Sequence, residues 1–144
     1  MTLLALALAT LQADARPVTF RLGPQGEIES WLVAKEPKSP YRAEGGEWRF
    51  AYASPKDGLD LGRALGGEKT YGLVGTTLVA DRARRATLLF GTDDGGTLTL
   101  NGRQLWSKTI VRGVVRDEER VELDLQPGEN TLIFRVDQGV GGWG

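Results

Sequence analysis

The chain has 144 residues, a formal net charge of −1, and neither cysteine nor histidine. Its length fits one domain with one core, and its near-zero charge argues against nucleic acid, which a basic surface would attract. Without cysteine and histidine there are no disulfides, no Ser-His or Cys-His nucleophiles and no zinc held by thiolate or imidazole. Any catalysis would need carboxylates, lysine, tyrosine or a bound cofactor.

An apolar run, LLALALATL, occupies residues 3–11, and an Ala-Asp-Ala pattern follows it and ends at Ala15. This arrangement is typical of a signal peptide, although no lysine or arginine precedes the run. The run is too short for a transmembrane helix, which needs about 20 residues. We expect a signal peptide at residues 1–15, a single domain at residues 16–144, and a secreted or periplasmic protein. The alternatives are a start that lies upstream, or an apolar run that belongs to the core.

The first half of the remaining chain alternates between strand-like segments and turn signals. Strands are expected at residues 18–22, 28–34, 48–52 and 70–80, with a turn at 23–26 and a proline-containing loop at 35–46. One helical turn is expected at 60–65, capped by Asp60 and ended by Gly66. Trp31 and Trp48 are assigned to the core.

Residues 86–136 predict further antiparallel strands with one polar face. Residues 86–90 and 97–100 are strand-like, and Asn101-Gly102 predicts a hairpin with the following strand, because a type I′ turn needs positive φ at both central positions. A second hairpin is expected between the alternating residues 121–125 and 132–136, around the turn QPGEN. Strands at this spacing, without long helices, predict an all-β antiparallel sandwich or barrel.

Arg82, Arg84 and Arg85 precede the strand at 86–90. They predict either a small anion site or a solvated charged turn. Asp81 lies beside them and the net charge is small, so the solvated turn is the preferred interpretation.

The order of several motifs resembles that of the galactose-binding-domain-like jelly-roll modules of secreted bacterial proteins. The motifs span residues 28–144 and are Trp31-Leu32-Val33, Asp57-Gly58-Leu59-Asp60-Leu61, the strand with Tyr71, FGTDDGGTLTLNGRQLW, Val111-Arg112-Gly113, VELDLQPGENTLIFRV and Gly141-Gly142-Trp143-Gly144. The resemblance implies a two-sheet antiparallel β-sandwich that serves as an accessory domain of a glycoside hydrolase or another extracellular enzyme. It also implies sugar binding on end loops in some relatives and a structural calcium ion in others.

The chain departs from these modules at two places. Residues 34–37 read Ala-Lys-Glu-Pro where relatives commonly have Gly-Pro-Phe, and the sequence stops at Gly144 where relatives continue with a final strand. The second departure suggests that the domain is truncated at its C-terminus, with an unpaired sheet edge.

A glycan site is predicted from Trp106, Trp143 and Arg112, because sugars stack on indole rings while charged groups bind their hydroxyls. The alternative is that both indoles pack in the core. Asp93 and Asp94 are candidates for binding a ligand or calcium, but adjacent residues point apart, so they do not form a catalytic carboxylate pair.

Calcium is the one candidate cofactor, near Asp57 and Asp60, whose oxygens suit a hard cation; the alternative is a turn followed by a helix cap. The literal G-x-G-x-x-G at 139–144 opens no helix and is not taken as a dinucleotide motif. We therefore expect a non-catalytic, carbohydrate-binding accessory module. The alternative is a structural or protein-interaction module that packs against a neighbouring catalytic domain or subunit.

Overall fold

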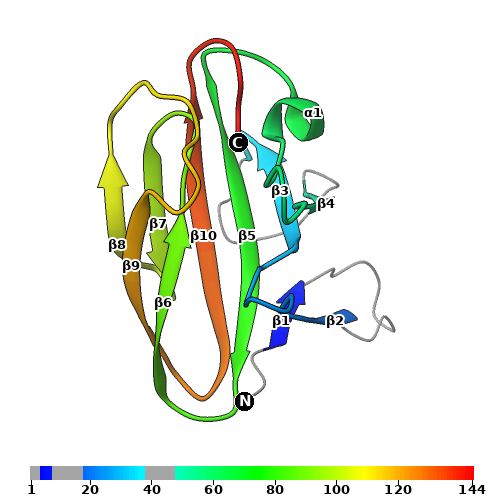
Figure 1. Ribbon diagram of the computed structural model, residues 1–144, viewed down its shortest axis with the longest axis vertical. Helices are drawn as coiled ribbons and strands as arrows, with labels where there is room; N and C mark the ends of the chain where they lie inside the picture. The colour runs from blue at the N-terminus through cyan, green and yellow to red at the C-terminus, as the bar shows by residue number, and fades with distance from the viewer. Residues whose placement is uncertain (1–3, 8–17, 38–47) are drawn as a thin grey trace.

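Two antiparallel sheets form the structure, a computed structural model that describes residues 4–7, 18–37 and 48–144, with side chains from residue 22 onward in those ranges (Figure 1). The 8-stranded sheet contains β1 (Leu4–Ala7), β2 (Val18–Arg21), β3 (Ser30–Lys35), β4 (Arg49–Tyr52), β5 (Thr70–Ala80), β7 (Gly96–Leu100), β8 (Arg103–Lys108) and β10 (Gly128–Gln138). The 2-stranded sheet contains β6 (Arg84–Phe90) and β9 (Glu119–Leu125), and α1 (Leu61–Leu65) follows β4. The predicted all-β, two-sheet sandwich is confirmed.

The long strands β5 and β10 form the centre of the large sheet. They pair along their whole length, from Thr70 opposite Gln138 to Ala80 opposite Gly128. The other edge of β5 is shared, because β3 pairs with its first half and β1 with its second half. Beyond β10 lie β7 and then β8.

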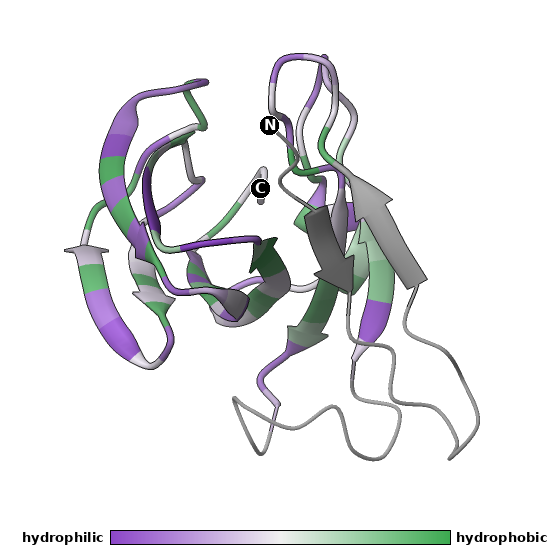
Figure 2. Ribbon diagram, turned by 90° about the horizontal axis from the view of Figure 1, so that it is seen from below, coloured by the Kyte–Doolittle hydropathy of each residue, from purple (hydrophilic) through white to green (hydrophobic). Residues whose placement is uncertain are grey.

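The core lies between the sheets, where alternate residues of each strand point inward. Figure 2 shows this alternation as changes between apolar and polar colour along the strands. Phe90 of the small sheet contacts both Phe134 and Trp106 of the large one, with ring centroids 4.8 and 5.1 Å apart. The largest fully buried side chains are Leu61, Leu78, Leu98, Leu125, Leu132, Val33 and Asn130.

The first predicted hairpin is confirmed, and the second is wrong. β7 and β8 pair around Asn101 and Gly102, whose φ angles are 50° and 80°. β9, however, pairs with β6, while β10 pairs with β5 and β7. The turn between them therefore carries the chain from one sheet to the other. Alternation along a strand tells which residues face inward, but not which strand is the neighbour.

The buried side chain of Asn130 holds this sheet-to-sheet turn. Its amide oxygen accepts from the backbone N–H of Gln126 at 2.8 Å, and its amide nitrogen donates to the carbonyls of Gln126 and Gly128 at 2.8 and 3.1 Å. The side chain of Asn101 adds a donor to the Asn130 oxygen at 3.0 Å. Both polar atoms of the buried Asn130 side chain thus have hydrogen-bond partners, as buried polar groups usually do.

Several local predictions agree with the structure. Asp60 caps α1 by accepting from the backbone N–H of Arg63 at 2.8 Å, and Gly66 ends the helix. Trp31 is buried, as predicted, whereas Trp48 is only half-buried. Residues 4–7 form β1, which pairs with β5 and β2 in the large sheet, and the signal peptide stays a prediction. Residues 8–17 lie outside the described part, so the cleavage at Ala15 stays a prediction.

The charged turn before β6 is solvated at Arg82 and Arg85, as expected, but not at Arg84. The strand begins at Arg84, so its side chain points to the same inner face as Ala86 and is only 10% exposed. Arg85 points outward, is 71% exposed and pairs with Asp124 at 3.1 Å. Strand periodicity thus gives the two neighbouring arginines opposite environments.

Candidate functional site

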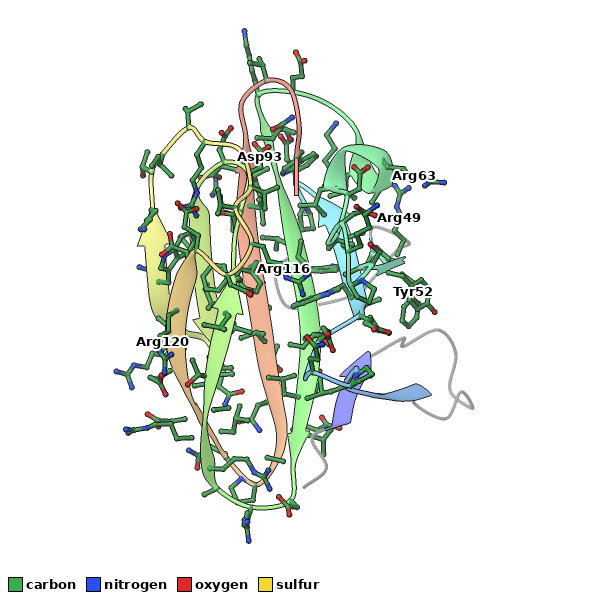
Figure 3. The ribbon with its side chains drawn as sticks, viewed as in Figure 1. Arg49, Tyr52, Arg63, Asp93, Arg116 and Arg120 are labelled. Atoms are coloured by element: carbon green, nitrogen blue, oxygen red, sulfur yellow. The ribbon has the colours of Figure 1, made fainter. Side chains whose placement is uncertain are left out.

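Three segments meet at one end of the sandwich and carry most of the residues predicted to bind a ligand (Figure 3). They are the β6–β7 loop with Asp93 and Asp94, the β8–β9 loop with Arg112, and the chain after β10 with Trp143; Trp106 lies on β8. Backbone hydrogen bonds join them: the Asp93 N–H donates to the Gly144 carbonyl at 2.8 Å, and the Gly95 N–H to the Ile110 carbonyl at 2.9 Å. The predicted residues therefore do gather, with Trp106 reaching the group through Glu119.

Arg112 is held by protein groups on all sides. Its Nε and Nη2 donate to the carbonyl and hydroxyl oxygens of Thr92 at 3.1 and 3.0 Å. Its Nη1 lies 2.8 Å from both Glu119 Oε1 and Glu118 Oε2. The side chain is only 10% exposed. Each guanidinium nitrogen thus has a partner within the chain, and this arginine fixes the β8–β9 loop against the β6–β7 loop.

Glu119, which the sequence did not single out, is the centre of this network. Its Oε2 accepts from Trp106 Nε1 at 3.0 Å, and its Oε1 accepts from Lys108 Nζ at 2.5 Å and from Arg112. The hydrogen bond from Lys108, together with those from Arg112 and Trp106, outweighs burial and lowers the pKa of Glu119 to about 2. The carboxylate therefore stays ionised at any ordinary pH, which suits an electrostatic anchor and not a proton donor.

The two adjacent aspartates have different surroundings. Asp94 is buried, and its two oxygens accept the backbone N–H groups of Arg112 and Gly139, each at 2.8 Å. Asp93 is half-buried and lies near Gly142. Burial, and then the charge of Asp94, raises the pKa of Asp93. Asp94 thus closes the junction of the loops; the ligand roles of both aspartates stay predictions.

Both candidate tryptophans pack against the protein. Trp143 is buried, and its indole lies over Gly72 of β5, where a Cβ would come within 3.0 Å of the ring. The Trp143 carbonyl also accepts the N–H of Leu61 at 2.9 Å, at the start of α1. Trp106 is half-buried against Phe90 and donates its N–H to Glu119. These contacts are those of packing, the alternative left open by the sequence, and sugar binding by this cluster stays a prediction.

Asp57 and Asp60 make the contacts of a turn and a helix cap. Asp57 Oδ2 accepts from the Ser54 hydroxyl at 3.2 Å, and Asp60 Oδ1 caps α1. Within the described ranges, no three acidic, histidine or cysteine side chains gather as a metal site would need. The two carboxylates do not fit a calcium site by themselves, and calcium binding stays a prediction.

A cleft of about 740 Å³ opens beside the small sheet, at a place that no sequence motif predicted. One wall is β6 from Thr87 to Phe90, and the opposite wall is the segment 53–59 that leads to α1. The floor is the inner face of the large sheet, with Trp31, Val74, Phe134 and Val136. These four side chains are only 4–9% exposed, and Phe90 of the small sheet packs on Phe134.

The cleft has a charged rim and one link across it. Arg116 on the β8–β9 loop donates from Nη1 to the carbonyl of Pro55 on the opposite wall at 2.7 Å. Figure 3 places Arg116 at mid-height of the molecule, in front of the large sheet. Further charged residues on the lining are Glu27, Glu29, Lys56, Asp57 and Asp117.

The β8–β9 loop also presents apolar side chains to solvent next to the cleft. In residues 110–115, here called the valine loop, Val111 is 86% exposed and Ile110, Val114 and Val115 are 45–56% exposed. The one charged residue of this loop, Arg112, points inward. This reverses the usual order, in which charged residues are outside and valines inside. The loop borders the cleft through Val114.

Comparison with known proteins finds no relative: no protein-family model, curated protein or solved structure matches the chain. The resemblance to galactose-binding-like modules therefore stays a prediction, while the two-sheet fold is established. Among the helices of the described ranges, none combines the length and the apolar character needed to cross a bilayer.

Proposed function

We propose that this chain is a non-catalytic β-sandwich module that binds another polypeptide on one face. The observation that carries the proposal is the cleft of about 740 Å³ between β6 and the segment 53–59, at the edge of the small sheet. Each Å² of apolar surface in the cleft that a partner removes from water is favourable by about 25 cal/mol. A partner that fills the cleft would complete the second layer of the sandwich.

The valine loop extends this face beyond the cleft. Contiguous apolar surface on a folded protein is typical of interaction sites. Arg112 and its partners hold the loop in place before any partner arrives, so little conformational entropy would be lost on binding. The proposed interaction face consists of the cleft and the valine loop.

A binding role also suits the chemistry of the chain. There is no histidine or cysteine to act as nucleophile or base. The carboxylates nearest the loops are engaged, Asp94 by two backbone N–H groups and Glu119 by three side chains. The resemblance to accessory modules of extracellular bacterial enzymes supports the same role, with a neighbouring domain or subunit as partner and a secreted or periplasmic location.

A second candidate is carbohydrate binding, and the cleft favours it at a place other than the predicted one. The aromatic rings of Trp31, Phe90 and Phe134 line the cleft, and carboxylates and cations stand on its rim. Aromatic surface with a few polar groups is how sugar sites are commonly built. The indole N–H of Trp31 donates to the Ile28 carbonyl at 2.8 Å, so this tryptophan could contact a sugar only through its ring and not through a hydrogen bond. The valine loop has no role in this alternative, and we therefore place it second.

The two candidates are separated by offering both kinds of ligand to the whole chain. A displayed library of random peptides and an array of glycans are screened against wild type and against Val114→Arg, which puts a charge on the proposed interaction face at a position that is 55% exposed. Trp106→Ala tests the predicted glycan cluster, and Arg120→Ala, on the outer face of β9, is the matched control. We expect enriched peptides whose binding is lost in Val114→Arg and kept in Arg120→Ala. Glycan binding without peptide binding would overturn the proposal in favour of the second candidate.

A further inference from the structure

The free edge of β6 lies along the cleft. Within the described part of the chain, β6 pairs with β9 alone, so the N–H and C=O groups on its other edge have no strand beside them. Residues 87–90 of this strand form the wall of the cleft. An unpaired edge next to an apolar floor is the arrangement that accepts an added strand.

We propose that the cleft binds an extended segment of a partner polypeptide, which adds to β6 as an antiparallel strand and carries an acidic residue near its C-terminal end. This inference rests on the proposed function, since it specifies how a polypeptide occupies the same face. Every strand pair of the described sheets is antiparallel.

The periodicity of a strand sets the apolar part of this ligand. A residue of the added strand points either to the floor of the cleft or to solvent, in alternation. The floor residues Trp31, Val74, Phe134 and Val136 are apolar, so the inward positions of the ligand should be apolar and the outward ones polar. At about 3.3 Å per residue, roughly seven residues would follow β6 from end to end.

Arg84 at the start of β6 sets the charge of the ligand. Its side chain is 10% exposed and lies on the inner face with Ala86 and Leu88. One nitrogen, Nη2, pairs with Asp81, but Nε and Nη1 are buried and have no hydrogen-bond partner among the described residues. Buried donors without partners are costly, and a carboxylate is the best acceptor for a guanidinium. In an antiparallel arrangement the residue that reaches Arg84 is near the C-terminal end of the segment.

A second copy of this chain does not fit as the occupant through its own β6. If the β6 strands of two copies paired antiparallel, a two-fold axis perpendicular to the sheet would relate the copies. The inner faces of both small sheets would then point to the same side. The large sheet of the second copy would then need the space that β3 and β5 already occupy beneath the cleft. A single extended segment avoids this clash.

The test uses a synthetic peptide of about nine residues, long enough to cover β6. Valine alternates with threonine or lysine, and the last inward position is glutamate. Two matched peptides replace that glutamate by glutamine or carry N-methyl groups on the peptide bonds that would face β6. Affinity is measured by fluorescence anisotropy with the whole chain. We expect the glutamate peptide to bind about tenfold more tightly than each matched peptide. The glutamine peptide lacks the charged hydrogen bond to Arg84, and the N-methylated peptide lacks the backbone hydrogen bonds to β6.

Arg84→Met removes the charge and keeps the length of the side chain, and Arg85→Met is the matched control on the outward face. The preference for glutamate over glutamine should disappear in Arg84→Met and persist in Arg85→Met. Circular dichroism and the thermal unfolding midpoint check that both variants fold. Equal affinity of the N-methylated and unmethylated peptides, or no binding of the designed peptide, overturns strand addition. If library peptides still bind and depend on Val114, the proposed function stands without this inference; if none binds, both fail.

Discussion

The inner face of the large sheet has two regions that differ in what covers them. Under β6 and β9, side chains such as Leu98 and Leu132 are fully buried by the opposing sheet. Toward β3 and β5, the segment 53–59 and α1 lie over the sheet, and the cleft opens beside them. The same sheet thus supplies a core closed by the second sheet at one side, and buried side chains at the bottom of an open cleft at the other. The comparison suggests that stability is concentrated in the closed region and binding in the open one.

The largest expected effect compares two buried leucines, one in each region. Leu98→Ala should destabilise the protein by about 3 to 4 kcal/mol, because the closed core cannot fill the void. Leu61→Ala, at the cleft, should cost only about 2 kcal/mol, because its void merges with existing space. Chemical denaturation measures both free energies of unfolding. Equal costs would show that the two regions are packed alike.

The Glu119 network should make the closed region sensitive to acid. Glu119→Gln leaves Lys108 and Arg112 without their shared carboxylate and should cost about 2 to 3 kcal/mol at neutral pH. Because the pKa of Glu119 is lowered from 4.5 to about 2, its contribution is complete above pH 4.5 and is lost as the pH falls toward 2. Thermal unfolding of wild type and variant should therefore converge between these pH values.

The control for this acid dependence is Glu122→Gln, at an exposed position of the same strand. We expect its free energy of unfolding to change by no more than about 0.5 kcal/mol at neutral pH. A constant difference between wild type and Glu119→Gln from pH 7 to pH 2 would contradict the role given to this carboxylate.

A smaller effect is expected at the link across the cleft. Arg116→Ala removes the hydrogen bond to the Pro55 carbonyl, and because the arginine side chain is 62% exposed the loss should be about 1 kcal/mol or less. Hydrogen exchange should become faster in the segment 53–59 and stay unchanged in β7. Faster exchange in both places would mean that the two regions open together.

The smallest effect concerns Asp93. Its raised pKa means that the folded state disfavours the ionised carboxylate, so Asp93→Asn should stabilise the protein at neutral pH, by about 0.5 kcal/mol. The gain should vanish below pH 3.8, the usual pKa of an aspartate, because the carboxyl group is then protonated in both the folded and the unfolded state. A destabilised variant at pH 7 would show that the carboxylate makes a favourable contact that its neutral amide cannot replace.

Local signals in the sequence predicted most of the elements, but not their partners. Asp60, Gly66 and Asn101-Gly102 act within a few residues, and the structure has the cap, the helix end and the turn where they were expected. The pairing of β9 with β6 depends on which sheet each strand joins, and no pattern within a strand records this. For the same reason the cleft could not be foreseen, because it results from a small sheet of only two strands.

The site was predicted in part. Asp93, Asp94 and Arg112 do come together, but Glu119, which connects Arg112 with Trp106, was missed because it looked like one more charged residue of an alternating strand. One signal was available: the run TIVRGVV places a single arginine among apolar residues in a loop. An arginine in such a setting usually has a buried partner, which would have pointed to a nearby acid.

The turn at Asn101 bears on how the protein ages. Asparagine before glycine is prone to deamidation, in which the following backbone nitrogen attacks the side-chain carbonyl carbon. In the folded chain the Asn101 amide oxygen accepts from the Thr131 N–H at 2.8 Å and its nitrogen donates to Asn130 at 3.0 Å, so the amide is kept from rotating toward that nitrogen. Loss of this amide should therefore be slow in stored native protein and rapid in heat-unfolded samples, where it would hinder recovery.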